Sequence, residues 1–365
     1  MPYKRYELPE YPLCRDMWDM ISEERRHIAV YGMGNGADKL FARLMRYGVS
    51  VSEVFASDGF VRGHSFRGYT VRSLSEVKAK YGDDFVILLS FASNRSEVIE
   101  MIGKINSECE MYIPDMPVAG EEYFDKDFYN AHYSEILSAY SALSDEDSKN
   151  AFAAIINYKL FGKAEYLWGC FSDTDDIYSL LPKDIKRAVD AGAYNGDTVR
   201  QLRSYRDTDV IYAAEPDKRN FKKLQKYVDE NALSKNVLPL NVALWSCDGR
   251  GSFFGSGNRN SSVSSTVSYE SRKEEAPLMK LDSFAEGKID YIKYDVEGAE
   301  REALLGSEQV IKASHPALLV SAYHRSEDIF SIVNYLSEKY PFYKLYIRRT
   351  MCFPAWEIAV IAIEK

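Results

Sequence analysis

The first 120 residues alternate short apolar runs with amphipathic stretches. The apolar run from Ile28 enters a glycine turn, and apolar residues between Leu40 and Met45 then recur at helical spacing, which predicts strand, turn and helix. Further predicted elements are helices over Met17–Arg26, Ser73–Lys80 and Ser96–Asn106, and strands over Val49–Asp58, Asp84–Ala92 and Met111–Pro114. This alternation is typical of a small parallel α/β unit, which we interpret as a first Rossmann-like domain.

From Glu121 the pattern changes to long helical segments. In the segment SDEDSKNAFAAIINYKLFG, Ser144 could cap the helix and Asp147 lies at the capping-box distance. We interpret residues 121–180 as a helical connector.

A second alternation of strands and helices begins near Ile185. Strands are predicted over residues 186–192, 209–216, 237–245, 288–295, 316–324, 342–349 and 357–365, and helices over Thr198–Tyr205, Lys218–Asn231, Ala299–Lys312 and Ser326–Tyr340. Such an order predicts a parallel sheet with right-handed crossovers. The last two strands have only Thr350–Trp356 between them, so they should form an antiparallel hairpin at the sheet edge. The predicted domains are 1–120, 121–180 and 181–365.

The second alternation of predicted strands and helices is interrupted between Cys247 and Pro277. This segment is rich in Ser, Gly and Asn and is long for a loop. It is either a functional insertion, such as a lid, or a surface excursion without a role.

Composition narrows the classes of function. Lys and Arg total 46 against 55 Asp and Glu, so the net charge of −9 argues against nucleic acid as a partner. The five cysteines are scattered without a CxxC pair, which argues against a disulfide framework and a cysteine zinc site. No apolar run approaches the roughly 20 residues that span a bilayer, and the first residues do not resemble a signal peptide. We expect a cytoplasmic protein without a membrane span.

The strongest local motif is VDAGAYNGDT, residues 189–198. Asp190 ends a strand, and Gly192 follows where the chain must turn and a ligand can approach the backbone. The next strand ends at Glu215, where an acid can accept both hydroxyls of an adenosine ribose. Asp190 and Asp197 beside the turn would repel a pyrophosphate, so the ligand should carry positive charge and no phosphate. S-adenosylmethionine has these properties.

A second group of acids, in DVEGAE, follows the strand that ends at Asp295. Glu297 and Glu300 could cap the next helix, whereas Asp295 lies at the ligand-binding edge of the predicted sheet. One strand later, His324 is the histidine of five that lies at a strand end on this edge. It could act as a general base or a ligand.

The motifs DAGAYNGDT, AAEP, LDSF, YIKYDVEGAE, SAYH and YIRR, taken in this order, resemble the FkbM family of S-adenosylmethionine-dependent methyltransferases. The resemblance covers roughly Leu181–Lys365. It implies a class I methyltransferase sheet of seven strands with the last pair antiparallel, and O-methylation, often of sugar hydroxyls in polysaccharide or natural-product assembly. The large N-terminal extension departs from the simplest members and leaves the acceptor open.

The resemblance also implies site residues. The methionine part of S-adenosylmethionine would be bound by Asp190, Gly192, Tyr194 and Asn195, and its ribose by Glu215. The methyl-transfer site would be lined by Asp295, which also counts among the cofactor-binding residues, and by Glu297 and His324.

The N-terminal glycine turn offers a separate hypothesis. Gly32, Gly34 and Ala37 satisfy GxGxxG/A, and Asp58 ends the next strand at about the position of a ribose-binding acid. The unit is short and has no recognisable acid–base set. A nucleotide or nucleotide-sugar contact, a scaffold role and a working dehydrogenase all stay open.

For the whole chain, three functions remain in competition: an O-methyltransferase, a nicotinamide oxidoreductase, and a non-catalytic sugar or nucleotide binder. A homo-oligomer is compatible with each. For the leading O-methyltransferase hypothesis, we expect a neutral His324 imidazole to take the hydroxyl proton. Asp295 would orient the hydroxyl or the imidazole, or would hold a divalent cation together with Glu297. We predict no dedicated metal site.

Overall fold

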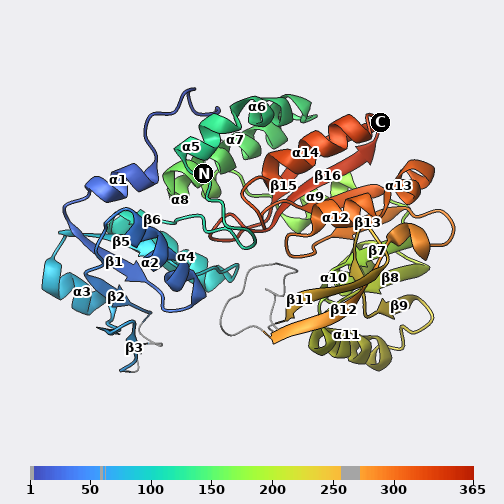
Figure 1. The fold of residues 1–365 in the computed structure, drawn as a ribbon, viewed down its shortest axis with the longest axis horizontal. Helices are drawn as coiled ribbons and strands as arrows, with labels where there is room; N and C mark the ends of the chain where they lie inside the picture. Colours follow the sequence, from blue (N-terminus) through green and yellow to red (C-terminus); the bar gives the residue numbers. More distant parts are fainter. Residues whose placement is uncertain (1–3, 58–60, 62, 256–271) are drawn as a thin grey trace.

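The structure is a computed structural model and describes residues 4–57, 61, 63–255 and 272–365. Two sheets lie at opposite sides of the molecule, with a group of helices packed between and above them (Figure 1).

The N-terminal sheet has four parallel strands in the order β2-β1-β5-β6. The central strands β1 and β5 are the most apolar, and all of β5 is buried. The elements are α1 (Met17–Glu23), β1 (His27–Tyr31), α2 (Asn35–Arg46), β2 (Glu53–Phe55), the short ribbon β3 (Ser65–Phe66) and β4 (Tyr69–Thr70), α3 (Leu74–Tyr81), β5 (Phe85–Leu89), α4 (Ser96–Glu108) and β6 (Met111–Tyr112). The predicted parallel α/β unit is thus confirmed, while its interpretation as a Rossmann-like nucleotide domain stays a prediction.

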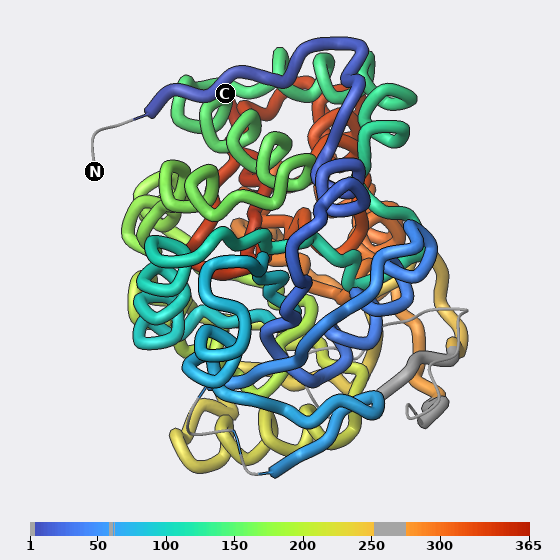
Figure 2. Tube along the Cα trace, turned by 90° about the vertical axis from the view of Figure 1, so that its left-hand side faces the viewer, coloured from blue at the N-terminus to red at the C-terminus, as the bar shows by residue number. Residues whose placement is uncertain are grey.

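The connector is helical, as predicted, with α5 (Lys126–Ala131), α6 (Tyr133–Ala142), α7 (Glu146–Phe161), α8 (Ala164–Trp168) and α9 (Thr174–Leu180). The N-terminal segment runs across these helices (Figure 2), where the Tyr6 N–H donates to Asn150 Oδ1 at 2.6 Å. No helix in the described part of the chain is long and apolar enough to cross a membrane.

The predicted cap of α7 is wrong by one residue. Asp145, not Ser144, accepts from the Ser148 N–H at 2.8 Å. Ser144 instead binds an edge strand of the C-terminal sheet, because its hydroxyl accepts from the Leu345 N–H at 3.0 Å.

The C-terminal sheet has seven strands in the order β15-β16-β14-β13-β7-β8-β9. β16 is antiparallel to both of its neighbours, as the short connection before it predicts, and the other described pairings are parallel. The strands are β7 (Arg187–Ala191), β8 (Val210–Ala214), β9 (Val237–Leu240), β13 (Tyr291–Tyr294), β14 (Ala317–Ser321), β15 (Tyr343–Arg349) and β16 (Ile358–Glu364). The helices around it include α10 (Asp197–Tyr205), α11 (Lys218–Glu230) and α14 (Asp328–Lys339).

The predicted single strand over residues 237–245 is wrong. After β9 the chain leaves the seven-stranded sheet, and β10 (Ala243–Leu244) pairs in a separate sheet with β12 (Arg272–Met279), which also pairs with β11 (Gly249–Gly255). The ends of the Ser/Gly/Asn-rich segment are therefore an antiparallel ribbon and not a loop. Its middle lies outside the described residues.

The predicted helix over Ala299–Lys312 is two helices, α12 (Glu300–Leu305) and α13 (Glu308–Ser314). The break falls at Gly306, where a Cβ atom would come within 1.9 Å of the Trp245 carbonyl oxygen. Close packing against the segment after β10 thus interrupts a sequence that has helical periodicity.

Candidate functional site

The turn after β7 packs tightly against the end of β13. Gly192 has φ +85°, and a Cβ atom there would lie 1.8 Å from the Asp295 carbonyl oxygen. Only glycine fits this position without displacing the neighbouring strand. The predicted glycine turn therefore brings the end of β7 and the end of β13 into one place.

Glu215, which follows β8, holds this turn with its carboxylate. Its two oxygens accept from the backbone N–H groups of Tyr194 and Asp217, both at 2.9 Å. Burial nevertheless raises the pKa of Glu215 to about 8. A carboxylate that is buried at a strand end and lines a cavity is well placed to accept ligand hydroxyl groups.

Two of the residues that the sequence predicts to bind the cofactor form hydrogen bonds that support the loop after β7. Asp190 is buried, accepts from the Thr198 hydroxyl, and is raised in pKa by desolvation. Asn195 accepts from the Asp197 N–H at 3.2 Å and belongs to neither of the two cavities described below. Both residues support the loop in this structure, and their direct contact with a cofactor stays a prediction.

A cluster of acids surrounds His324 at the ends of β13 and β14. The histidine Nε2 atom lies 3.6 Å from Asp295 Oδ1 and 3.6 Å from Glu297 Oε2, and its Nδ1 atom lies 3.0 Å from Glu300 Oε1. The adjacency of β13 and β14 brings Asp295 and His324 together as predicted.

The charges in this cluster bear on the protonation state of His324. Burial alone would lower the pKa of His324, but Glu300, Glu297 and Asp295 together raise it to about 10. In the unliganded protein the three carboxylates favour the imidazolium over the neutral imidazole, and the role of His324 as a base stays a prediction. Burial raises the pKa of Glu297 to about 8, and Glu297 also has an unfavourable φ of +56°.

Sequence reasoning missed Lys293 and Tyr323. The Lys293 ammonium lies 3.6 Å from Asp190 Oδ1 and 3.4 Å from Asp295 Oδ2, so it neutralises both carboxylates. These acids raise the pKa of Lys293, although burial by itself would lower it. The Tyr323 hydroxyl donates to Asp295 Oδ1 at 3.3 Å.

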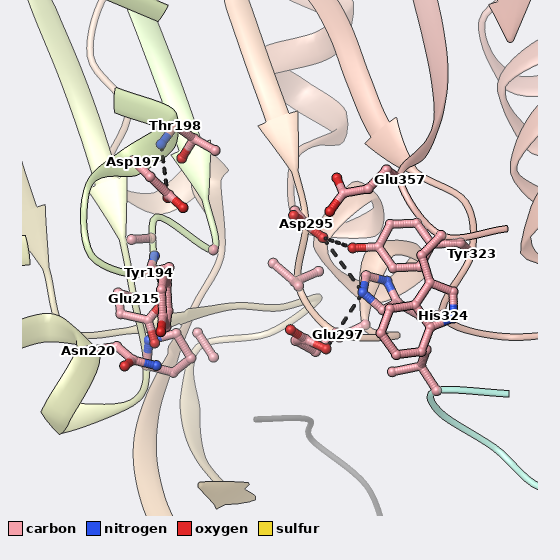
Figure 3. A pocket seen from close by; sticks show the side chains of 18 of the residues that line it. Tyr194, Asp197, Thr198, Glu215, Asn220, Asp295, Glu297, Tyr323, His324 and Glu357 are labelled. Atoms are coloured by element: carbon pink, nitrogen blue, oxygen red, sulfur yellow. Dashed lines mark hydrogen bonds and ion pairs between the residues drawn. The ribbon is translucent and has the colours of Figure 1, made fainter. Parts of the chain in front are cut away.

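The two groups of residues face each other across one cavity of roughly 310 Å³ (Figure 3). Tyr194, Glu215 and Asn220 lie on one side, and Asp295, Glu297 and His324 lie on the other. A second cavity of roughly 380 Å³ shares Asp295 with the first and includes Lys293. No Lys or Arg occurs among the described residues that line the first cavity.

One ligand atom from each of Asp295, Glu300 and His324 lies within 4.8 Å of the others, so the cluster could hold a metal ion. The imidazolium of His324 is an alternative counter-ion for the same carboxylates. A metal-assisted and a metal-free site both fit these residues, and a chelator separates them.

The N-terminal glycine turn is explained in part by packing. A Cβ atom at Gly36 would lie 2.1 Å from the Ser90 carbonyl oxygen, and one at Gly32 would lie 2.6 Å from the Ser90 hydroxyl. Gly34 has no described atom within 4 Å of that position, and Asp58 lies outside the described residues. A nucleotide at this turn stays a prediction.

Comparisons with known proteins bear on the C-terminal half. Residues 190–342 match the family model of the methyltransferase FkbM domain, which supports a methyltransferase. The solved structure of a methyltransferase FkbM from Methylobacillus flagellatus KT matches with a TM-score of 0.66 at 18% identity, over 98% of this chain and 94% of that one. At this identity the match shows the fold, which extends through the N-terminal region.

Partial matches include an rRNA methylase from Streptococcus thermophilus, with 12% identity and a TM-score of 0.34 over 52% of this chain and 92% of that one. A precorrin-6y C5,15-methyltransferase from Geobacter metallireducens GS-15 matches with 12% identity and a TM-score of 0.33, over 52% and 87%. Among curated proteins, the comparison found no match.

Proposed function

We propose that this protein is an S-adenosylmethionine-dependent O-methyltransferase that acts on a hydroxyl group of a sugar, glycoconjugate or natural product. One observation carries the proposal. The carboxylate of Glu215 faces the cluster of Asp295, Glu297 and His324 across a single cavity. Such an arrangement suits a cofactor on one side and a hydroxyl acceptor on the other.

The chemistry of the first side fits S-adenosylmethionine. Glu215 would bind the ribose hydroxyls, and the apolar residues Val242–Leu244 would cover the adenine. The described lining has acids and no Lys or Arg, which suits a sulfonium cation and disfavours a pyrophosphate. When bound, S-adenosylmethionine supplies an electrophilic methyl group.

The second side would orient the acceptor and take its proton. A hydroxyl group is too weak an acid to ionise at neutral pH, so a base must receive the proton. Glu297 lines the cavity and has a pKa of about 8, which is close to the pH at which such a base works best. In our proposal the Glu297 carboxylate is this base, and it replaces the neutral His324 imidazole of the sequence prediction.

His324 would act as a positioning residue in its charged form. Its Nε2 atom lies 3.6 Å from both Asp295 and Glu297, and Glu300 holds the other side of the ring. Glu300 Oε1 also accepts from the Val296 N–H at 2.9 Å, which ties the ring to the backbone of the loop. Asp295, held by Lys293 and Tyr323, would orient the hydroxyl group.

The proposal is tested by transfer of label from methyl-labelled S-adenosylmethionine to small molecules of a cell extract, followed by mass spectrometry. We expect a labelled product with the wild type and none with Glu297→Gln. If the wild type gives no more labelled product than Glu297→Gln does, the proposal is contradicted. If a chelator abolishes transfer and Mg²⁺ restores it, the metal-free form of the mechanism is wrong. The competing oxidoreductase predicts oxidation of NADH or NADPH that is lost in Gly34→Val.

A further inference from the structure

The N-terminal unit supplies part of the wall of the proposed methyl-transfer cavity. Ala92, Ser93 and Asn94, which follow β5, line this cavity together with Val118. The Ala119 N–H donates to the His324 carbonyl at 2.8 Å, so the adjoining segment is fixed to the end of β14. The cavity is therefore incomplete without residues from the first 120.

Backbone hydrogen bonds hold the wall segment against the loop between β15 and β16. Ser93 and Phe353 exchange two of them, at 2.8 and 3.0 Å. Phe353 is fully buried and packs against the Trp168 ring with centroids 5.0 Å apart. This anchoring fixes the position of the loop that carries Trp356.

Trp356 is placed beside the reacting side of the cavity. It lines the cavity, and its ring lies nearly parallel to that of Tyr323 at 6.5 Å between centroids. Tyr323 in turn donates to Asp295, on the side opposite Glu215 (Figure 3). The indole Nε1–H of Trp356 is buried and has no hydrogen-bond partner among the described residues, so what Trp356 offers to the cavity is its ring.

The charge of the wall limits the class of acceptor. The described lining residues of this cavity include no Lys or Arg, and the one histidine among them, His324, lies among three carboxylates. A phosphate or carboxylate on the acceptor would meet Asp295, Glu297 and Glu357 without a Lys or Arg to pair with. An uncharged ring with hydroxyl groups would meet an aromatic side chain, the amide of Asn94 and carboxylate acceptors.

We infer that Trp356 and Asn94 form the acceptor subsite, that the N-terminal unit completes it, and that it takes an uncharged sugar ring without a phosphate or carboxylate group. This inference rests on the proposed function and adds the substrate class and a role for the first 120 residues. Trp356 provides the aromatic surface, and Asn94 provides a polar group from the segment after β5.

The test is saturation-transfer difference NMR in the presence of S-adenosylhomocysteine. The probes are methyl glycosides of neutral hexoses and the pair glucose and glucose 6-phosphate. We expect transfer to at least one neutral glycoside, and stronger transfer to glucose than to its phosphate. Trp356→Ala should weaken glycoside binding roughly tenfold, Trp356→Phe should retain part of it, and Asn94→Ala should weaken it. Phe171→Ala, an exposed aromatic outside the cavity, is the control and should change nothing.

The same samples are titrated with S-adenosylhomocysteine by calorimetry. Its affinity should stay within about twofold in Trp356→Ala and Asn94→Ala, because these residues are placed on the acceptor side. The inference is wrong if no neutral glycoside binds, if glucose 6-phosphate binds as well as glucose, or if Trp356→Ala binds like the control. Failure of the wild type to bind S-adenosylhomocysteine would instead overturn the proposed function.

Discussion

His324 and Glu300 form a buried pair, with Nδ1 of the imidazole 3.0 Å from Oε1 of the carboxylate and each side chain 1% exposed. Solvent cannot screen this contact, so the carboxylate favours the charged form of the histidine. The same pair joins the loop after β13 to the end of β14. The charge state of the site and the shape of the loop that carries Glu297 are therefore linked.

This link makes the pH dependence of turnover informative. Because the pKa of Glu297 is about 8, the rate should rise with pH and level off above about pH 8. Glu297→Gln should reduce turnover by ~10²–10⁴-fold. The measurement is the pH–rate profile of methyl transfer. If the rising limb lies near pH 10 and persists in Glu297→Gln, the base is His324, whose pKa is about 10.

Lys293 should be essential for stability because it is the counter-ion of two acids. Lys293→Met leaves Asp190 without its cation and leaves Asp295 with His324 alone, and loss of one partner from a buried ion pair costs about 3–5 kcal/mol. The free energy of unfolding, from denaturant titration, should fall accordingly. Adding Asp190→Asn should restore part of the loss. A single variant as stable as the wild type would refute the role of Lys293.

Gly192 and Gly34 make a matched pair. Gly192→Ala places a Cβ atom 1.8 Å from the Asp295 carbonyl oxygen at φ +85°, whereas Gly34 has φ −115° and no described atom within 4 Å of its Cβ position. We expect Gly192→Ala to lower the melting temperature and abolish binding of S-adenosylhomocysteine. Gly34→Ala should change the free energy of unfolding by less than about 0.5 kcal/mol. Equal melting curves for the two variants would contradict the packing described here.

Glu215 should make the unliganded protein less stable at alkaline pH. Its pKa is about 8 in the folded protein and near 4.5 without burial, so it binds its proton more tightly when folded. The stability it contributes is present below pH 4.5 and is lost as the pH rises through 8. The melting temperature of Glu215→Gln minus that of the wild type should therefore increase from pH 5 to pH 9. Glu230→Gln, on the exposed side of α11, should show no such trend.

Strand periodicity predicted both sheets and the antiparallel end of the larger one, because buried parallel strands leave a clear apolar pattern. It also predicted that Asp295 and His324 share an edge. It did not predict Lys293, whose contact with Asp190 depends on the pairing of β13 beside β7. The lateral order of strands is not encoded in local periodicity, so a cation within a strand looked like an ordinary polar position.

The wall formed by Ser93 and Asn94 was missed for a related reason. Ser93 is bound to Phe353 through backbone hydrogen bonds, which depend on no particular side chain and leave no pattern in the sequence. The break between helices α12 and α13 at Gly306 likewise depends on a tertiary contact, here with the Trp245 carbonyl. Tertiary contacts of this kind override helical or strand propensity locally.

The central claim is that S-adenosylmethionine binds beside Glu215 in the cavity that also contains Asp295 and His324. Isothermal titration calorimetry with S-adenosylhomocysteine tests it directly on the wild type, Glu215→Ala and the surface control Glu230→Ala. We predict one binding event per chain for the wild type and the control. Glu215→Ala should bind more weakly by roughly 1–3 kcal/mol, through loss of the carboxylate that accepts the ribose hydroxyls. Absence of binding to the wild type, or equal affinity in a folded Glu215→Ala, would contradict the claim.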